Sequence, residues 1–201
     1  MKYTTLLVFL LTLSTTKSQT EKDRISFQTE LNLQYGNKDS SPLTNKEVKA
    51  FKGLPFYAWN KDYVVIATVK RTPDAPLFKM ETTSNRTPLY QQYAIATFIL
   101  KGKKEQLRIY QSQDSKFSFD YKDYLFLPFK DTTNGVDTYE GGRYVDVFIS
   151  NIINNTILID FNKAYNPYCA YNHNYSCPIP PSENHMDTAI EAGIKKGLIK
   201  E

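Results

Sequence analysis

The chain has 201 residues, of which 41% are hydrophobic and 23% are charged, a composition that supports a globular core and excludes wholesale disorder. Lys and Arg outnumber Asp and Glu only by 25 to 21, and the net charge of +4 is weaker than the clustered basic excess of nucleic-acid-binding proteins. Two Cys and two His residues are too few for a zinc array or a disulfide-dense miniprotein. The 15 Tyr and 12 Phe residues favour a β-rich fold, because aromatic side chains suit a half-buried pleated surface.

Residues 1–18 have the order of a secretory signal peptide. Lys2 supplies the positive charge, residues 6–13 form a short apolar run, and small residues precede a possible cut before Gln19. A buried N-terminal helix or strand is the alternative. We predict that the mature chain, residues 19–201, is one β-rich domain in the periplasm or outside the cell. It is not expected to insert into a membrane, because no stretch reaches the roughly 20 apolar residues of a spanning helix.

Two helices are predicted near the start of the mature chain. Between residues 21 and 35, apolar residues recur at every fourth position and so lie on one helical face. A second, short helix is expected after Thr44, which stands three residues before Glu47 in the arrangement of a capping box. This helix should end near Gly53.

From Leu54 onward the hydrophobic period changes to two, and Gly, Pro and Asn separate short runs rich in β-branched and aromatic residues. Strands are predicted at 63–72, 77–82, 93–100, 107–111, 124–129, 143–149 and 156–161. A Gly-containing loop at 101–106 would join the third strand to the fourth, and an Asn-rich turn would join the last two strands as a hairpin. Short strands at this spacing predict an antiparallel β-barrel or sandwich with a helical N-terminal arm.

The tail from Met186 fits two structures. Its apolar residues match a helix face, and they match an alternating strand nearly as well. Asn184 as a cap and the Ala and Glu content favour the helix slightly.

Residues 129–144 combine three glycines with hydroxyl side chains, two aspartates and Arg143. Glycines permit a close backbone approach, so such a loop can cradle a ligand. The alternative is a tight turn between strands, with Asn134 and Gly135 as the hairpin signal. Phosphate-loop spacing is absent, so nucleotide binding is not expected, and neither a cofactor nor a metal is predicted.

Residues 160–184 form a long irregular segment that holds both cysteines, His173 and four prolines. Loops of this length are uncommon unless they are functional or disordered, and the aromatic and proline content argues against disorder. In an exported protein a disulfide between Cys169 and Cys177 is the leading interpretation. A zinc site with a histidine, a nucleophilic cysteine and buried free thiols are the alternatives.

At these two segments the chain resembles a bacterial and archaeal family known as domain of unknown function 1684. The first signature, F-x-D-x-T-x-G-x-x-T-Y-x-x-G-R-Y, is met by residues 129–144. The second, D-F-N-x-A-Y-N-P-x-C-A-Y followed by C-P-x-P-P-x-E-N, is met by residues 160–171 and 177–184. The resemblance implies a β-rich domain and supplies no reaction. The resemblance favours a functional site at both segments over simple turns. It also weakens the case for a helix in the tail, which is extended in many relatives.

The sequence thus predicts an exported module that binds a small polar or carbohydrate-like ligand, with its oligomeric state left open. Tyrosine rings offer apolar faces, and Asp and Asn supply directional hydrogen bonds. The residues expected to contact the ligand are Asp131, Thr138, Tyr139, Arg143, Asp160, Asn162, Asn166 and Glu183.

Two alternatives stay open. One is a hydrolase with Asp160 or Glu183 as the general base and Arg143 stabilising developing negative charge. The other is a structural or protein-interaction module, in which residues 129–144 and 160–184 only stabilise the domain. If the strands at 143–149 and 156–161 pair as a hairpin, Arg143 and Asp160 meet at one edge of the sheet and can form an ion pair.

Overall fold

The computed structural model describes residues 22–197, and the chain divides into two compact units, Met1–Gly53 and Leu54–Glu201. The segment predicted as a signal peptide, residues 1–18, lies outside the described residues. The second unit holds the whole sheet, and the single β-rich domain expected over residues 19–201 stays a prediction.

The first unit is helical. Residues 22–36 form a helix, as the apolar periodicity predicts, and a second helix, α2, spans Asn45–Ala50. The Thr44 side chain accepts a hydrogen bond from the Glu47 amide, and the Thr44 amide donates to the Glu47 carboxylate at 2.7 Å, which confirms the capping box. Within this unit the ring of Tyr35 packs against that of Phe51, with centroids 6.4 Å apart.

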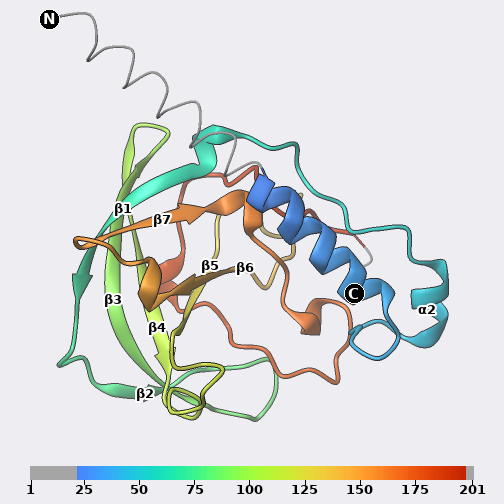
Figure 1. The fold of residues 1–201 in the computed structure, drawn as a ribbon, viewed down its shortest axis with the longest axis horizontal. Helices are drawn as coiled ribbons and strands as arrows, with labels where there is room; N and C mark the ends of the chain where they lie inside the picture. Colours follow the sequence, from blue (N-terminus) through green and yellow to red (C-terminus); the bar gives the residue numbers. More distant parts are fainter. Residues whose placement is uncertain (1–21, 198–201) are drawn as a thin grey trace, which may run out of the picture. The chain divides into compact units, whose positions relative to one another are not determined.

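The second unit is an antiparallel sheet that curls into a half-barrel (Figure 1), which confirms a mainly β fold. Its strands lie in the order β6-β5-β4-β3-β1-β7, and β2 pairs with β3 outside this path. The strands are β1 (Val64–Arg71), β2 (Leu77–Lys79), β3 (Leu89–Leu100), β4 (Lys103–Ser112), β5 (Tyr124–Phe129), β6 (Arg143–Phe148) and β7 (Thr156–Asp160). Short 3-10 helices flank them: η1 (Lys61–Tyr63), η2 (Ile149–Asn151), η3 (Phe161–Lys163), η4 (Tyr168–Ala170) and η5 (Ser182–Asn184).

The hairpin of β3 and β4 is longer than the sequence pattern suggests. Leu100 pairs with Lys103, so the loop expected at 101–106 shrinks to Lys101 and Gly102. Both residues have positive φ, 49° and 78°, the conformation of the two-residue turns that match the twist of the flanking strands. The charged residues that look like a loop in the sequence are therefore the exposed start of β4.

The predicted hairpin of the last two strands is wrong. β6 pairs with β5, its predecessor in the chain, and β7 pairs with β1, so β6 and β7 form the two edges of the path. The chain passes from one edge to the other through the 3-10 helix η2 and a turn at Asn154 and Asn155. Both asparagines have positive φ. Alternation along a strand reports which face is buried, and it does not identify the partner strand.

The inner face of the curled sheet holds the main core. Buried side chains from every strand of the path meet there, among them Ala67, Phe98, Ile109, Leu127, Val145 and Ile159. A second, aromatic cluster lies around Met80, Tyr110, Phe126 and Tyr144. The ring of Phe126 is 4.7 Å from that of Tyr144 in an edge-on arrangement, a favourable geometry for aromatic pairs.

The expected helix in the tail is absent from the described residues. The segment after η5 runs extended, with an isolated bridge between Phe56 and Ile194. Met186, Thr188, Ile190 and Ala192 are buried while Asp187 and Glu191 are exposed. Burial of this alternating face against the half-barrel outweighs the weak helix propensity of the segment.

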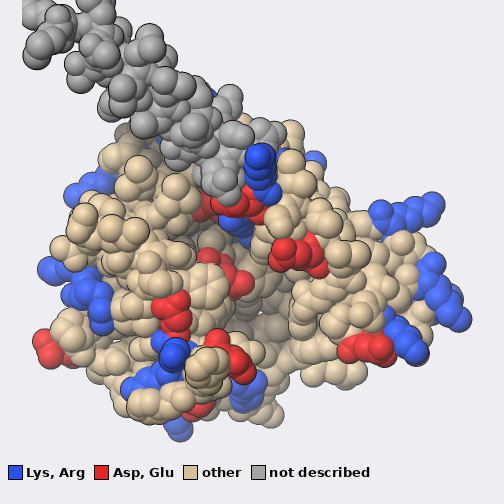
Figure 2. Space-filling model, in the orientation of Figure 1, with Lys and Arg blue, Asp and Glu red and all other residues tan. Residues whose placement is uncertain are grey.

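Charges of both signs are interspersed over the face of the molecule drawn in Figure 2. No helix in residues 22–197 is long and apolar enough to cross a membrane. Within the same residues, no group of three or more His, Cys, Asp or Glu side chains is placed to hold a metal ion.

Candidate functional site

The segment between β5 and β6 is tied by an internal network around Asp131. One carboxylate oxygen of Asp131 accepts hydrogen bonds from the Thr133 amide at 2.9 Å and the Thr133 hydroxyl at 2.6 Å. Thr133 in turn lies 2.9 Å from the hydroxyl of Thr138, and Gly135 donates to the Thr138 carbonyl at 3.0 Å. The predicted turn at Asn134 and Gly135 is therefore present, and its hydroxyl groups bond to each other and to Asp131.

Arg143 is wholly buried and clamps the C-terminal segment. Its Nη2 donates to the carboxylate of Asp131 at 2.8 Å and to the Ile190 carbonyl at 2.8 Å, while Nη1 donates to the carbonyls of Ala192 at 2.5 Å and Ile194 at 3.3 Å. Burial lowers the pKa of Arg143, and the neighbouring Asp131 carboxylate opposes that shift. The guanidinium thus satisfies backbone carbonyls that have no partner in the sheet.

Gly142 allows the chain to enter β6 beside this clamp. Its φ of 95° is in the left-handed region, and a Cβ there would lie 2.7 Å from the Phe129 carbonyl oxygen and 2.8 Å from the ring of Pro180. Only glycine tolerates both the conformation and the close approach.

The residues that follow β7 are also structural. Asp160 accepts from the amide and side chain of Asn162 at 3.0 and 2.8 Å, and Asn162 exchanges two hydrogen bonds with the backbone of Asn60. Asn166 is fully buried and donates to the Tyr171 hydroxyl at 3.0 Å. These hydrogen bonds fix the course of the chain from the end of β7 through η4.

The expected ion pair of Arg143 with Asp160 does not form. Arg143 pairs with Asp131, and the strands that carry Arg143 and Asp160 pair with different neighbours. The guanidinium is enclosed by Asp131 and the carbonyls of the tail, so it faces neither of the cavities described below.

Asn184 is an organising residue that the sequence signature contains but does not explain. Its side chain accepts from the Arg108 amide at 2.7 Å and donates to the carbonyls of Arg108 at 2.9 Å and Pro128 at 2.7 Å. Pro128 has no amide hydrogen, and Asn184 takes the place of a ladder bond between β4 and β5. The fully buried amide thereby holds η5 against the sheet.

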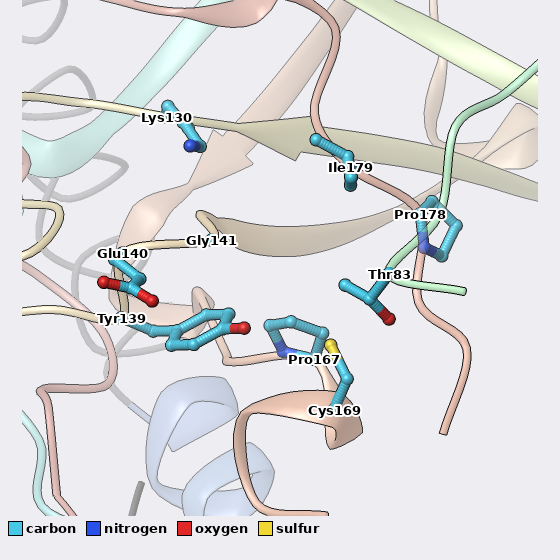
Figure 3. Close-up of a pocket in the computed structure, with 9 residues that line it drawn as sticks. All are labelled: Thr83, Lys130, Tyr139, Glu140, Gly141, Pro167, Cys169, Pro178 and Ile179. Carbon is cyan, nitrogen blue, oxygen red and sulfur yellow. The ribbon is translucent and has the colours of Figure 1, made fainter. Parts of the chain in front are cut away.

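The segment 177–185 borders two cavities. The first, here called the Cys169 pocket, has a volume of about 410 Å³. Its lining includes Thr83, Lys130, Tyr139, Glu140, Pro167 and Cys169. Figure 3 shows the sulfur of Cys169 between the hydroxyl groups of Tyr139 and Thr83. A Cβ at Gly141 would lie 2.3 Å from the Tyr139 ring, so glycine is what lets this ring fold back along the chain into the pocket.

Cys169 and Cys177 are both buried and are present as free thiols. The Cys169 amide donates to the sulfur of Cys177 at 3.1 Å. Hydrogen bonds from Cys177, Thr83 and Tyr139 lower the pKa of the Cys169 thiol, whereas the bond to Cys169 and burial raise that of Cys177. The predicted Cys169–Cys177 disulfide stays a prediction.

The second cavity, here called the Tyr110 pocket, has a volume of about 690 Å³. Strands β2, β3 and β4 supply one wall and residues 179–185 supply the other. Its lining includes Phe78, Gln92, Arg108, Tyr110, Glu183 and His185. The Phe78 and Tyr110 rings meet edge-on with centroids 5.6 Å apart, and Arg108 Nη1 donates to the Glu183 carbonyl at 3.2 Å. Burial raises the pKa of Tyr110, and the nearby Glu183 carboxylate adds to that shift.

The structure separates the sequence-predicted ligand residues into two groups. Tyr139 lines the Cys169 pocket and Glu183 lines the Tyr110 pocket. The others are buried and bonded within the protein: Asp131, Thr138, Arg143, Asp160, Asn162 and Asn166. Arg108, Tyr110 and Phe78 were not singled out from the sequence, because in β2 and β4 they look like ordinary strand residues.

The sequence and the fold both have relatives. The model of the family described as "Protein of unknown function (DUF1684)" matches residues 49–195. The solution NMR structure of an uncharacterized protein from Haloarcula marismortui is similar, with 31% identity, a TM-score of 0.70, and coverage of 90% of this chain and 96% of that chain. No curated protein matches the chain. Neither description names a ligand, so any function must be argued from the cavities.

Proposed function

Because the chain belongs to the DUF1684 family, whose function is unknown, we propose a function from its geometry: it binds a small polar or carbohydrate-like ligand in the Tyr110 pocket. One observation carries the proposal. Tyr110 is only 3% exposed, and it lines the cavity of about 690 Å³ together with Phe78 and Arg108. A tyrosine hydroxyl both donates and accepts hydrogen bonds, so it can fix the orientation of a polar ligand in this cavity.

The remaining lining suits such a ligand. Small-molecule sites are concave, mostly apolar and typically about 300–1,000 Å³ in volume, with a few polar groups that fix orientation. Phe78 offers an aromatic edge and face, Arg108 offers donors, and the Glu183 carboxylate accepts hydrogen bonds. Hydroxyl groups on a saturated ring match this mixture of apolar faces and directional partners.

The proposal is tested by thermal unfolding of the purified mature protein against a panel of monosaccharides, disaccharides and small polar metabolites. A binder is expected to raise the melting temperature, because a ligand that binds only the folded state stabilises it. Tyr110→Phe removes the hydroxyl and keeps the ring, so it should lose most of the response. Tyr121→Phe, at a residue that is 52% exposed, is the matched control and should retain it. A response that Tyr110→Phe leaves intact would place the ligand elsewhere.

We further propose that the protein is exported and is periplasmic or secreted after removal of residues 1–18. The charged, apolar and small-residue order of that segment supports this. Intact-mass measurement of protein from the native envelope fraction should give a chain that starts at Gln19 or within a few positions of it. A mature chain that retains Lys2 contradicts the proposal.

A Cys169–Cys177 disulfide is proposed for the protein in that oxidising compartment. The Cys169 amide donates to the Cys177 sulfur at 3.1 Å, which supports the pairing of these two residues. Thiol titration of the denatured, unreduced protein from the exported compartment should find no free cysteine, and two free thiols would refute the bond.

A further inference from the structure

The two cysteines are held together by the backbone on both sides. The Cys177 amide donates to the Thr83 hydroxyl at 3.1 Å, and the Thr83 amide donates to the Cys177 carbonyl at 2.9 Å. Cys169 lies in η4, where its amide is bound to the Cys177 sulfur. The backbone at Thr83 and the amide of Cys169 therefore both contact Cys177 and hold the two cysteines beside each other.

The pair is asymmetric in access and in electrostatics. Both cysteines are buried, and Cys169 lines the Cys169 pocket whereas Cys177 is not part of the lining. The Cys169 sulfur lies between the hydroxyl groups of Tyr139 and Thr83 (Figure 3), and the neighbouring Cys177, Thr83 and Tyr139 side chains lower the pKa of the Cys169 thiol. The thiol with the lowered pKa is therefore the one that a molecule in the pocket would meet, which is the arrangement that thiol–disulfide exchange requires.

We propose that Cys169 and Cys177 are a redox-active pair that reduces a small disulfide bound in the Cys169 pocket, with Cys169 as the attacking thiol and Cys177 as the resolving thiol. The Cys169–Cys177 disulfide proposed for the exported protein is the product of this reaction. In the first step the Cys169 thiolate attacks one sulfur of the disulfide, and the other half leaves as a thiolate that takes up the proton lost by Cys169. In the second step Cys177, as a thiolate, attacks the Cys169 sulfur and displaces the remaining half, which leaves as a thiolate and takes up the proton lost by Cys177. The protein loses two protons and two electrons, and the small disulfide becomes two thiols.

The cavity restricts the substrate class. A volume of about 410 Å³ admits a disulfide of two amino-acid-sized halves. Lys130 and Glu140 both line the pocket, and Figure 3 draws them from the same side of it as Tyr139. Opposite charges at one wall suit a disulfide whose ends carry carboxylate and ammonium groups.

In the test, fully reduced protein is mixed with cystine and the reaction is quenched with acid. The masses of the protein products are then measured by mass spectrometry. The wild type should convert to the form that lacks two hydrogens. Cys177→Ser cannot resolve and should accumulate an adduct of one cystine half on Cys169. Cys169→Ser should react about tenfold more slowly, because the remaining thiol does not line the pocket and has a raised pKa. An adduct mapped to Cys177, or equal rates for Cys169→Ser and the wild type, would overturn the assignment.

Two further measurements separate this activity from a merely structural cysteine pair. A structural pair would react with cystine only in urea, where both thiols are exposed, and that outcome refutes the proposal. Lys130→Gln should slow the reaction with cystine more than that with the uncharged 2-hydroxyethyl disulfide, whereas the surface variant Lys122→Gln should change neither. Equal effects of Lys130→Gln on both probes would refute the charged substrate class. Reaction at Cys169 is independent of ligand binding in the Tyr110 pocket, so either proposal can fail alone.

Discussion

Asp131 and Arg143 form an ion pair in which neither side chain is exposed to solvent, with Arg143 Nη2 2.8 Å from the carboxylate of Asp131. The pair closes the loop between β5 and β6, and through three backbone carbonyls it fixes the C-terminal segment at Ile190, Ala192 and Ile194. The amide of Ile190 completes the arrangement by donating to Asp131 at 3.1 Å. Two residues of the first family signature, Asp131 and Arg143, therefore hold the C-terminal segment in place through hydrogen bonds.

Arg143→Lys should destabilise the protein. The ammonium keeps the charge but cannot reach Asp131 and the tail carbonyls together, because it lacks the planar fork. Buried groups left unpaired cost about 1–3 kcal/mol each, so we expect the free energy of unfolding to fall by about 3 kcal/mol in urea titrations. Arg86→Lys, at an exposed position, is the control and should change little. Unchanged stability together with a lost ligand response would instead indicate that Arg143 binds the ligand.

Asn184→Ala should also destabilise the protein, since three hydrogen bonds to β4 and β5 are lost in a fully buried site. The Arg108 amide and two carbonyls would lose their partner, and we expect a loss of about 3 kcal/mol. Asn85→Ala, at an exposed position, is the matched control. Equal unfolding midpoints for the two variants would contradict the structural role of Asn184.

Tyr139→Phe should slow alkylation of Cys169 at neutral pH. Hydrogen bonds, of which that from Cys177 is the largest and that from Tyr139 is one, lower the pKa of Cys169 to about 7. Because the thiolate is the reactive form, the rate with iodoacetamide should rise through that pH in the wild type. Removing the Tyr139 hydroxyl removes one stabilising donor, so the midpoint should move to higher pH. A midpoint that moves down or stays would show that the hydroxyl does not stabilise the thiolate.

Gly141→Ala should also move the midpoint of Cys169 alkylation to higher pH, although the Tyr139 hydroxyl is still present. The added methyl group would lie 2.3 Å from the Tyr139 ring, so the ring must leave its place. Gly36→Ala is the control, since its methyl group would be 3.6 Å from its nearest neighbour, an ordinary contact. An alkylation profile for Gly141→Ala that matches the wild type would mean that Tyr139 is not held by this contact.

Local patterns predicted the elements better than their partners. Apolar periodicity located the first helix and the strand at Tyr124–Phe129, because both signals are contained within the element. The partner of β6 could not be predicted this way, since Arg143–Phe148 has the same alternation against β5 or β7. In the tail, the strand-like alternation from Met186 was the correct signal, and local composition pointed to the wrong alternative.

The candidate site was harder to predict for a related reason. An arginine is almost never fully buried unless it is paired, so the burial of Arg143 depends on Asp131 and on a tail that is distant in sequence. Polar residues in a family signature look the same whether they bind a ligand or hold the backbone. Tyr139 and Glu183 face cavities, whereas Asn162 and Thr138 bond inward, and only the folded chain separates the two kinds.

Amide chemical-shift mapping with the monosaccharide and metabolite panel is the most direct test of the proposed ligand binding in the Tyr110 pocket. A binder should shift the amides of Arg108, Tyr110, Glu183 and His185, and Tyr110→Phe should abolish these shifts. Shifts centred on the clamp of Asp131 and Arg143, or no shifts at saturating concentrations of any compound, would contradict it.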